Sequence, residues 1–99
     1  MEYQVVIAPR AIRDLEEIVR YVAQDNPSAA VQLGLVLIEK TKELTQWPEL
    51  GRMVPEFDDP KIRELILKPY RIIYRVDSTA GVIGVARFWH AARGLPELR

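Results

Sequence analysis

The segment Tyr70-Arg71-Ile72-Ile73-Tyr74-Arg75-Val76 (YRIIYRV) alternates with the two-residue period of a β-strand. Its tyrosines, together with Ile72 and Val76, would lie on one face, and its arginines, together with Ile73, on the other. Aromatic and β-branched residues favour a buried pleated surface, whereas arginines favour solvent. We therefore predict a strand with one face in the core and one basic face.

Two further strand patterns flank this segment. Residues 61–67 (KIRELIL) precede it and are separated from it by Lys68-Pro69. Residues 82–89 (VIGVARFW) follow it after a polar turn at residues 77–81 (DSTAG). Strands joined by such short connections run antiparallel. The second half of the chain is therefore predicted to form a meander.

The first half of the chain predicts one strand and two helices. Residues 3–8 (YQVVIA) form a short β-branched run that stops at Pro9. Beyond it, apolar residues recur with helical spacing at Ala11, Leu15, Ile18 and Val22. Asn26 followed by Pro27 is typical of the start of a new helix, which we expect to extend to Trp47. The short turn between the two helices predicts an antiparallel helical hairpin.

Residues 47–60 contain three prolines and Gly51 but little apolar periodicity. We predict a pinned loop here, with Trp47 packed against the end of the second helix. The order of elements is thus βααβββ, which predicts an α+β fold with the helical hairpin on one face of a mostly antiparallel sheet. A length of 99 residues fits a single domain that spans residues 1–99.

The composition excludes several classes of chemistry. The chain has no cysteine, which rules out disulfides, a cysteine nucleophile and the usual cysteine-based zinc sites. Apolar residues make up 48% of the chain, enough to fold a core rather than remain disordered. The longest apolar runs are far shorter than the ~18 residues of a membrane span, and Glu2 opens a start unlike a secretory signal. We expect a cytoplasmic protein that needs no metal or cofactor.

Charge is distributed unevenly, although the formal net charge is zero. Residues 1–60 carry six basic and eleven acidic residues, a net charge of −5. Residues 61–99 carry eight basic and three acidic residues, a net charge of +5. The pattern is compatible with a basic surface that faces an acidic partner, and equally with internal packing of the acidic part against the basic part.

Several short motifs follow one another along the chain. The C-terminal ones are Ile62-Arg63-Glu64-Leu65, the strand that begins at Tyr70, and a last strand that runs into His90-Ala91-Ala92-Arg93. The N-terminal ones are Ala8-Pro9-Arg10-Ala11, Asp14-Leu15-Glu16-Glu17-Ile18, Tyr21-Val22-Ala23 and Pro48-Glu49-Leu50-Gly51-Arg52. In this order and spacing they resemble the RelE/ParE superfamily of toxin-antitoxin toxins. The resemblance covers essentially the whole chain and implies the βααβββ fold, a toxin function and a cognate antitoxin as partner.

The resemblance also implies one of two targets. RelE-like toxins cut messenger RNA in the ribosomal decoding site, whereas ParE-like toxins inhibit DNA gyrase without known hydrolytic chemistry. For a metal-independent endoribonuclease it points to Arg63, Arg71 and His90 as catalytic residues, with Arg71 in the position of a phosphate-contacting arginine. The candidates for contact with the target or partner are Arg63, Arg71, Arg75, Arg87, Trp89, His90 and Arg93.

Several features of the sequence favour the ParE-like branch. His90 is the only histidine, so the acid and the base of a ribonuclease cannot both be histidines. Glu64 stands where RelE-type enzymes tend to be lysine-rich, and no tyrosine follows Tyr74. The sequence pI of about 6.6 is low for a protein that docks inside ribosomal RNA. We predict gyrase inhibition, with a ribosome-dependent messenger endoribonuclease and a non-toxic antitoxin-binding relic as alternatives.

Each of these candidates also has a purely structural interpretation. Arg71 and Arg75 are compatible with a solvated stripe that protects the sheet from aggregation. His90, just after an apolar strand, is more typical of a hydrogen-bonded structural histidine than of a catalytic one. Trp89 shares the parity of the arginines and is compatible either with an exposed contact or with burial under a second layer of apolar cover.

Overall fold

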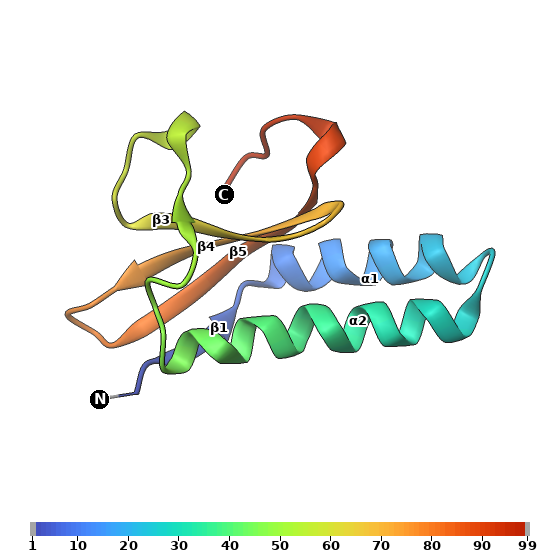
Figure 1. Ribbon diagram of the computed structural model, residues 1–99, viewed down its shortest axis with the longest axis horizontal. Coiled ribbons are helices and arrows are strands. Elements are labelled where there is room, and N and C mark those ends of the chain that lie inside the picture. The colour runs from blue at the N-terminus through green and yellow to red at the C-terminus, as the bar shows by residue number, and fades with distance from the viewer. Residues whose placement is uncertain (1, 99) are drawn as a thin grey trace.

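The computed structural model describes residues 2–98 and consists of a five-stranded sheet with a helical hairpin on one face (Figure 1). The strands are β1 (Gln4–Ile7), β2 (Arg52–Met53), β3 (Ile62–Leu67), β4 (Tyr70–Asp77) and β5 (Val82–His90). The helices are α1 (Pro9–Ala23) and α2 (Pro27–Lys42), and short 3-10 turns span Glu43–Thr45, Pro55–Phe57 and Ala91–Arg93. The predicted α+β fold is confirmed, with the two-residue β2 added inside the region expected to be a loop.

The strands lie in the order β1-β5-β4-β3-β2. Strand β1 runs parallel to β5, and every other pair is antiparallel, so the sheet is mostly antiparallel as predicted. Strand β5 carries an irregularity at Ala86, because Ile73 lies opposite Arg87 whereas Tyr74 lies opposite Val85. This extra residue lets Val85 face the hairpin while Arg87, two positions later, faces the other side.

Local sequence explains where the helices begin. Proline occupies the first position of both α1 and α2, where the missing N–H has no helical partner to lose. The Asn26 side chain caps α2 by accepting a hydrogen bond of 3.1 Å from the N–H of Ala29. Helix α2 ends at Lys42, earlier than the expected end at Trp47, and a 3-10 turn follows it. Within residues 2–98, none of the helices has the length and apolar character needed to span a membrane.

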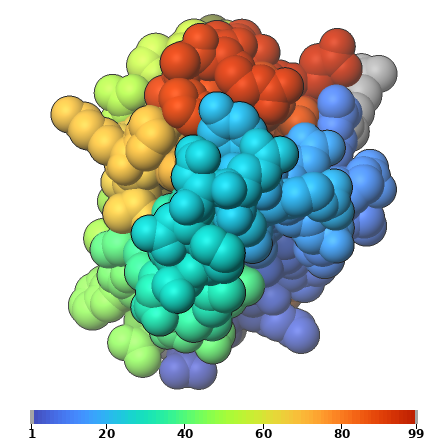
Figure 2. Space-filling view, turned by 90° about the vertical axis from the view of Figure 1, so that its right-hand side faces the viewer, coloured from blue at the N-terminus to red at the C-terminus, as the bar shows by residue number. Residues whose placement is uncertain are grey.

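The hairpin is longer than the sheet that it covers. In Figure 1 the ends of α1 and α2 that meet at the turn reach well beyond the strands. Figure 2 looks onto this end and shows it in front of the rest of the molecule. The far part of the hairpin is therefore covered by strands on neither side.

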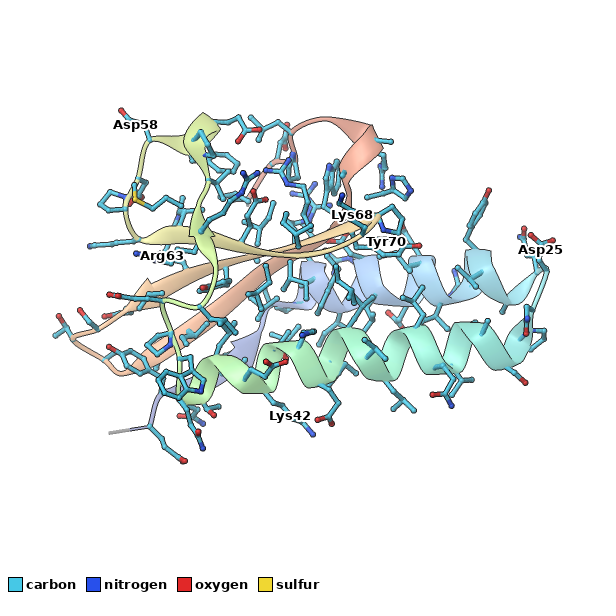
Figure 3. All side chains as sticks on the ribbon, in the orientation of Figure 1. Asp25, Lys42, Asp58, Arg63, Lys68 and Tyr70 are labelled. Carbon is cyan, nitrogen blue, oxygen red and sulfur yellow. The ribbon has the colours of Figure 1, made fainter. Side chains whose placement is uncertain are left out.

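The main core lies between the sheet and the hairpin, and Figure 3 shows the layer filled with side chains, with Tyr70 beside α1. Its buried members from both layers are Ala11, Leu37, Leu44, Tyr70, Ile72, Tyr74, Ile83, Val85 and Phe88. Leu15 and Ile18 of α1 pack against it and stay partly exposed. The predicted apolar face of β4 and the predicted inner stripe of α1 are confirmed.

The face of the sheet turned away from the hairpin, called the outer face below, is not simply basic. Ile73 of β4 is fully buried there with Val54 and Ile62, and Phe57 and Leu98 pack against them. The segment between α2 and β3 thus supplies a second, smaller layer of cover, which was one of the two alternatives left open for Trp89. The expectation for Trp47 was also wrong, because its side chain is 63% exposed.

Candidate functional site on the outer face of the sheet

Four of the predicted contact residues gather at one end of the outer face. Arg71 lies directly opposite Trp89 in the β4–β5 register, and Arg87 precedes Trp89 by one strand period on the same side. Arg93 follows in the 3-10 turn after β5 and places its guanidinium over the Trp89 ring. We call Arg71, Arg87, Trp89 and Arg93 the arginine–tryptophan cluster.

Trp89 is held on several sides at once. The guanidinium carbons of Arg87 and Arg93 lie 4.5 Å and 4.3 Å from its ring centroid, within the range of cation–π attraction. Its indole N–H donates a 3.0 Å hydrogen bond to the carbonyl of Gly94. The side chain is 8% exposed, so Trp89 is a packed part of the sheet rather than a free contact. Arg93, in contrast, remains exposed on top of it.

Arg71 is buried against a buried carboxylate. Its Nε donates to Oε1 of Glu64 at 2.5 Å, and its Nη2 lies 3.6 Å from a carboxylate oxygen of Glu56. The other oxygen of Glu64 accepts from Nε and Nη2 of Arg52 at 2.8 Å and 2.7 Å. Two arginines therefore share the Glu64 carboxylate, and Arg71 is 8% exposed. This finding corrects the interpretation of Arg71 as part of a solvated stripe.

Arg87 forms a second internal pair, with Asp14 of α1. Its Nε and Nη2 donate to the two oxygens of the Asp14 carboxylate at 2.6 Å and 2.9 Å, and its Nη1 donates to the carbonyl of Glu97 at 2.6 Å. Asp14 also accepts the backbone N–H of Phe88 at 3.2 Å, beyond the end of β1. The hydrogen bonds to Asp14 raise the pKa of Arg87, against the opposing effect of burial. This bidentate geometry fixes α1 to the open edge of β5.

These ion pairs join the acidic and basic parts of the chain. Asp14, Arg52 and Glu56 come from residues 1–60, and their partners Arg87, Glu64 and Arg71 come from residues 61–99. Internal packing of the two parts, one of the two alternatives that the charge pattern left open, therefore accounts for Arg87, whereas Arg71 pairs mainly with Glu64 of its own part.

The remaining predicted residues lie outside the arginine–tryptophan cluster. Arg63 lies in β3 between β2 and β4 and donates to the carbonyl of Gly51 at 2.9 Å. Arg75 shares the outer face but is exposed, separated from Arg71 by the buried Ile73. His90 lies opposite Tyr70 on the hairpin side, with the two ring centroids 5.4 Å apart. Arg63, Arg71 and His90, the three candidate catalytic residues, are thus not brought together on one surface.

His90 makes a local hydrogen bond that suits a structural role. Its Nδ1 accepts the backbone N–H of Ala92 at 3.1 Å, where the 3-10 turn begins. The ring also packs edge-on against Tyr70, with an interplanar angle of 82°. The hydrogen-bonded structural interpretation of His90 therefore agrees with its geometry.

A second buried polar group positions the segment after α2. The Tyr74 hydroxyl donates to the carbonyl of Pro48 and accepts the N–H of Gly51, each at 2.9 Å. Burial raises the pKa of this hydroxyl above its ordinary value. A Cβ at Gly51 would come within 2.5 Å of the Glu64 carbonyl oxygen and 2.7 Å of the hydroxyl, so the close approach requires glycine.

The sequence interpretation missed Asp14 and Glu64 as functional partners of the arginines. In the sequence, Asp14 cannot be distinguished from the other charged residues on the polar face of α1. Glu64 carries a weak signal, since a lone carboxylate shares the parity of Ile62 and Ile66 in an apolar strand (IRELIL), where an unpaired charge would be costly if buried. That signal predicts a buried ion pair but does not identify the arginine.

Comparisons with known proteins agree with this geometry. The family described as the ParE toxin of the type II toxin-antitoxin system parDE matches residues 5–95. Toxin RelE2 of Caulobacter vibrioides is 37% identical over 91 residues, which cover 91% of this chain and 97% of the relative. Toxin RelE1 of the same organism is 31% identical over 94 residues, covering 91% and 95%.

Solved structures show the same fold. The chromosomal ParDE system from P. aeruginosa aligns with a TM-score of 0.73 and 25% identity, covering 90% of this chain and 96% of the other. The toxin-antitoxin complex RelBE2 from Mycobacterium tuberculosis aligns with a TM-score of 0.68 and 19% identity, covering 91% and 99%. With its fold, its motifs and these matches in agreement, the chain belongs to the RelE/ParE superfamily of type II toxin-antitoxin toxins.

Proposed function

We propose that this toxin acts in the cytoplasm by binding and inhibiting DNA gyrase, and that a cognate antitoxin neutralises it. The observation that carries the proposal is the internal pairing of the arginines on the outer face. Arg71 and Arg87 are the most central cations of the arginine–tryptophan cluster, and both are neutralised by carboxylates of the same chain.

Cleavage of RNA without a metal makes demands that this arrangement does not favour. A base must take the proton of the 2′-hydroxyl, an acid must protonate the leaving oxygen, and cations must stabilise the charge on phosphorus. Arg71 is held by Glu64 and lies on the outer face, whereas His90 lies on the hairpin side with Nδ1 already hydrogen-bonded. A binding mechanism needs no such constellation.

A specific observation also supports the second candidate, a ribosome-dependent messenger endoribonuclease. The curated relatives at 37% and 31% identity carry the name RelE. Arg93 and Arg75 are exposed near or on the outer face and are suited to contact phosphates. The experiment must therefore measure both activities on the same protein.

The deciding experiment compares gyrase and ribosomes directly. Purified toxin is added to a gyrase supercoiling assay and, separately, to ribosomes programmed with a defined messenger. We expect inhibition of supercoiling or trapping of cleaved DNA, together with intact messenger. His90→Gln should inhibit gyrase as the wild type does, because no proton is transferred. Cleavage of the messenger at a defined site, lost in His90→Gln, would overturn the proposal in favour of the ribonuclease.

Arg93 offers a surface variant that leaves the buried ion pairs intact. Arg93→Glu reverses the exposed charge beside Trp89 and should weaken inhibition of gyrase about tenfold if an acidic surface is bound there. Arg75→Glu is the matched control, since it reverses an exposed charge elsewhere on the same face. Equal loss in both variants would show a general charge effect rather than a contact at Arg93.

The antitoxin is expected to bind along the open edge of β3. Strand β2 pairs with Arg63 and Glu64 alone, so residues 65–67 of β3 have no strand on that side. Ile66 is 47% exposed there, and the basic part of the chain provides a counter-charge for an acidic segment. Addition of an antitoxin strand to this edge would satisfy its backbone groups.

Growth experiments test the toxin-antitoxin pair. Expression of the toxin alone should arrest growth with filamentation, and coexpression of the antitoxin encoded by the neighbouring gene should restore growth. Ile66→Asp should lower the affinity for the antitoxin at least tenfold with gyrase inhibition unchanged. A toxin that is harmless when expressed alone, yet binds the neighbouring gene product, would identify the non-toxic relic instead.

A further inference from the structure

Helix α2 carries apolar residues on both of its long sides. Leu33 and Leu37 pack into the core, as an amphipathic surface helix requires. On the other side, Val31 and Leu35 are 57% and 53% exposed. A helix that is apolar all round is normally covered all round, so the solvent-facing side of this hairpin has the character of an interface.

The exposed side of the hairpin is shaped as a groove. The space between the helices has a volume of about 500 Å³, and its apolar lining consists of Leu15, Val19, Val31, Gly34, Leu35 and Ile38. At its floor, a Cβ added to Gly34 would lie 3.1 Å from a methyl group of Val19. The glycine therefore lets α1 and α2 approach closely and leaves room above them for side chains of another helix.

Two opposite charges of α1 line this groove. Glu16 and Arg20 are one helical turn apart, and neither makes an ion pair with another residue in the described part of the chain. A pair of opposite charges beside an apolar stripe is self-complementary, because a two-fold axis places Glu16 of one copy against Arg20 of the other.

The charge of the hairpin also favours a second copy over an acidic segment. Residues 10–45 carry five basic and six acidic residues: Arg10, Arg13, Arg20, Lys40 and Lys42 against Asp14, Glu16, Glu17, Asp25, Glu39 and Glu43. The surplus of positive charge lies in residues 61–99 instead. An acidic partner is thus attracted to the sheet, and the nearly neutral, apolar groove suits a surface like itself.

We propose that this groove docks a second copy of the chain, so that two hairpins form a four-helix bundle about a two-fold axis. Each helix is about 23 Å long, and the hairpin extends beyond the sheet, so two hairpins can meet without a clash between sheets (Figures 1 and 2). The bundle is an ordinary way to bury such faces. The contact is small for a stable dimer, so the dissociation constant should lie at about 1–50 µM. The inference does not depend on the target of the toxin.

Sedimentation velocity on the purified chain, at concentrations from about 1 to 200 µM, tests the proposal. We expect a monomer–dimer equilibrium in the wild type. Leu35→Glu should raise the dissociation constant at least tenfold. Val36→Glu is the matched control, because Val36 is 42% exposed on the same helix but does not line the groove, and its effect should stay within about threefold. Thermal melts check that both variants fold.

A charge exchange identifies the two-fold geometry. Glu16→Arg alone and Arg20→Glu alone should each weaken self-association about tenfold, because like charges then face each other. An equimolar mixture of the two variants should dimerise as the wild type does, since every Arg then faces a Glu. A wild type that is monomeric at 200 µM would overturn the proposal, and so would a mixture no better than its components. In the first case, a loss of antitoxin affinity in Leu35→Glu would assign the groove to the antitoxin.

Discussion

The outer face of the sheet holds two buried arginines, each paired with a carboxylate of the same chain: Arg71 with the nearby Glu64, and Arg87 with the distant Asp14 of α1. The solvent-facing side of the hairpin holds Val31 and Leu35, each more than half exposed. Charged residues thus serve the fold in the first region, and apolar residues are left without partners in the second. In this molecule, residue type alone therefore does not separate structural from interaction surfaces. What separates them is whether the chain itself supplies the partner.

The largest effect should follow from breaking the pair at Glu64. Glu64→Leu leaves Arg71 buried without its carboxylate and should lower the free energy of unfolding by about 3–5 kcal/mol. Glu56→Gln, which alters an exposed partner 3.6 Å from Arg71, should lower it by less than about 1 kcal/mol. Denaturant unfolding of both variants measures the difference. Equal effects would mean that the outer face is a solvated stripe after all.

The two sides of α2 allow a second test. Leu37→Ala removes a side chain with 0% exposure and should lower the free energy of unfolding by about 2–5 kcal/mol. Leu35→Ala, on the groove side of the same helix, should change it by less than about 1 kcal/mol in the monomer. Thermal and denaturant melts at low micromolar concentration check both. A large effect of Leu35→Ala under these conditions would mean that the groove is already filled within one chain.

Tyr74 should give a smaller, pH-dependent effect. Tyr74→Phe leaves the Gly51 N–H and the Pro48 carbonyl without their buried partner, which should lower the free energy of unfolding by about 1–3 kcal/mol at neutral pH. The pKa of the hydroxyl is raised in the folded state. Its contribution is therefore fully present below the unfolded pKa of about 10 and is lost as the pH rises through the folded pKa.

The measurement for Tyr74 is the stability difference between wild type and Tyr74→Phe from pH 7 to about pH 11. The difference should shrink as the pH rises above about 10, because only the wild type loses stability by ionising this group. A difference that is constant, or that grows with pH, would contradict the raised pKa.

Arg75 should give the smallest effect. Its side chain is exposed on the outer face, and Arg75→Ala should change the free energy of unfolding by no more than about 0.5 kcal/mol. Arg71 and Arg75 both belong to β4. The difference between the stability losses in Glu64→Leu and in Arg75→Ala therefore measures how much pairing and burial change the contribution of an arginine to the free energy of unfolding. A loss of more than 1 kcal/mol would show that Arg75 has a structural partner as well.

Patterns confined to a few neighbouring residues made most of the fold predictable. The alternation that ends at Val76 placed Tyr70, Ile72 and Tyr74 in the core, and Asn26-Pro27 marked the start of α2. Both signals depend only on local backbone geometry, so they can be recognised in a single sequence without knowledge of distant contacts.

The candidate site was predicted less completely, because its geometry depends on contacts between distant residues. Arg71 and Trp89 were found from their parity on the strands, and Arg93 was found from the family resemblance. Their partners were not, since Asp14 is 73 residues away from Arg87 and no periodicity relates them. The irregularity at Ala86 likewise has no local signal, although it decides that Arg87 faces outward. The choice between gyrase and the ribosome depends on surfaces that face other molecules.

The parallel pairing of β1 with β5 bears on how the toxin is made. Strand β1 pairs with β5, which comes much later in the chain, and β5 is also the strand that joins β1 to the rest of the sheet. Contacts between such distant segments form late. During synthesis the hairpin emerges early. A complete sheet can cover its inner apolar side only after residues 82–90 have been made. The growing chain is thus without a finished sheet until residues 82–90 have been made, which gives an antitoxin already present in the cell time to meet the hairpin before the sheet is complete.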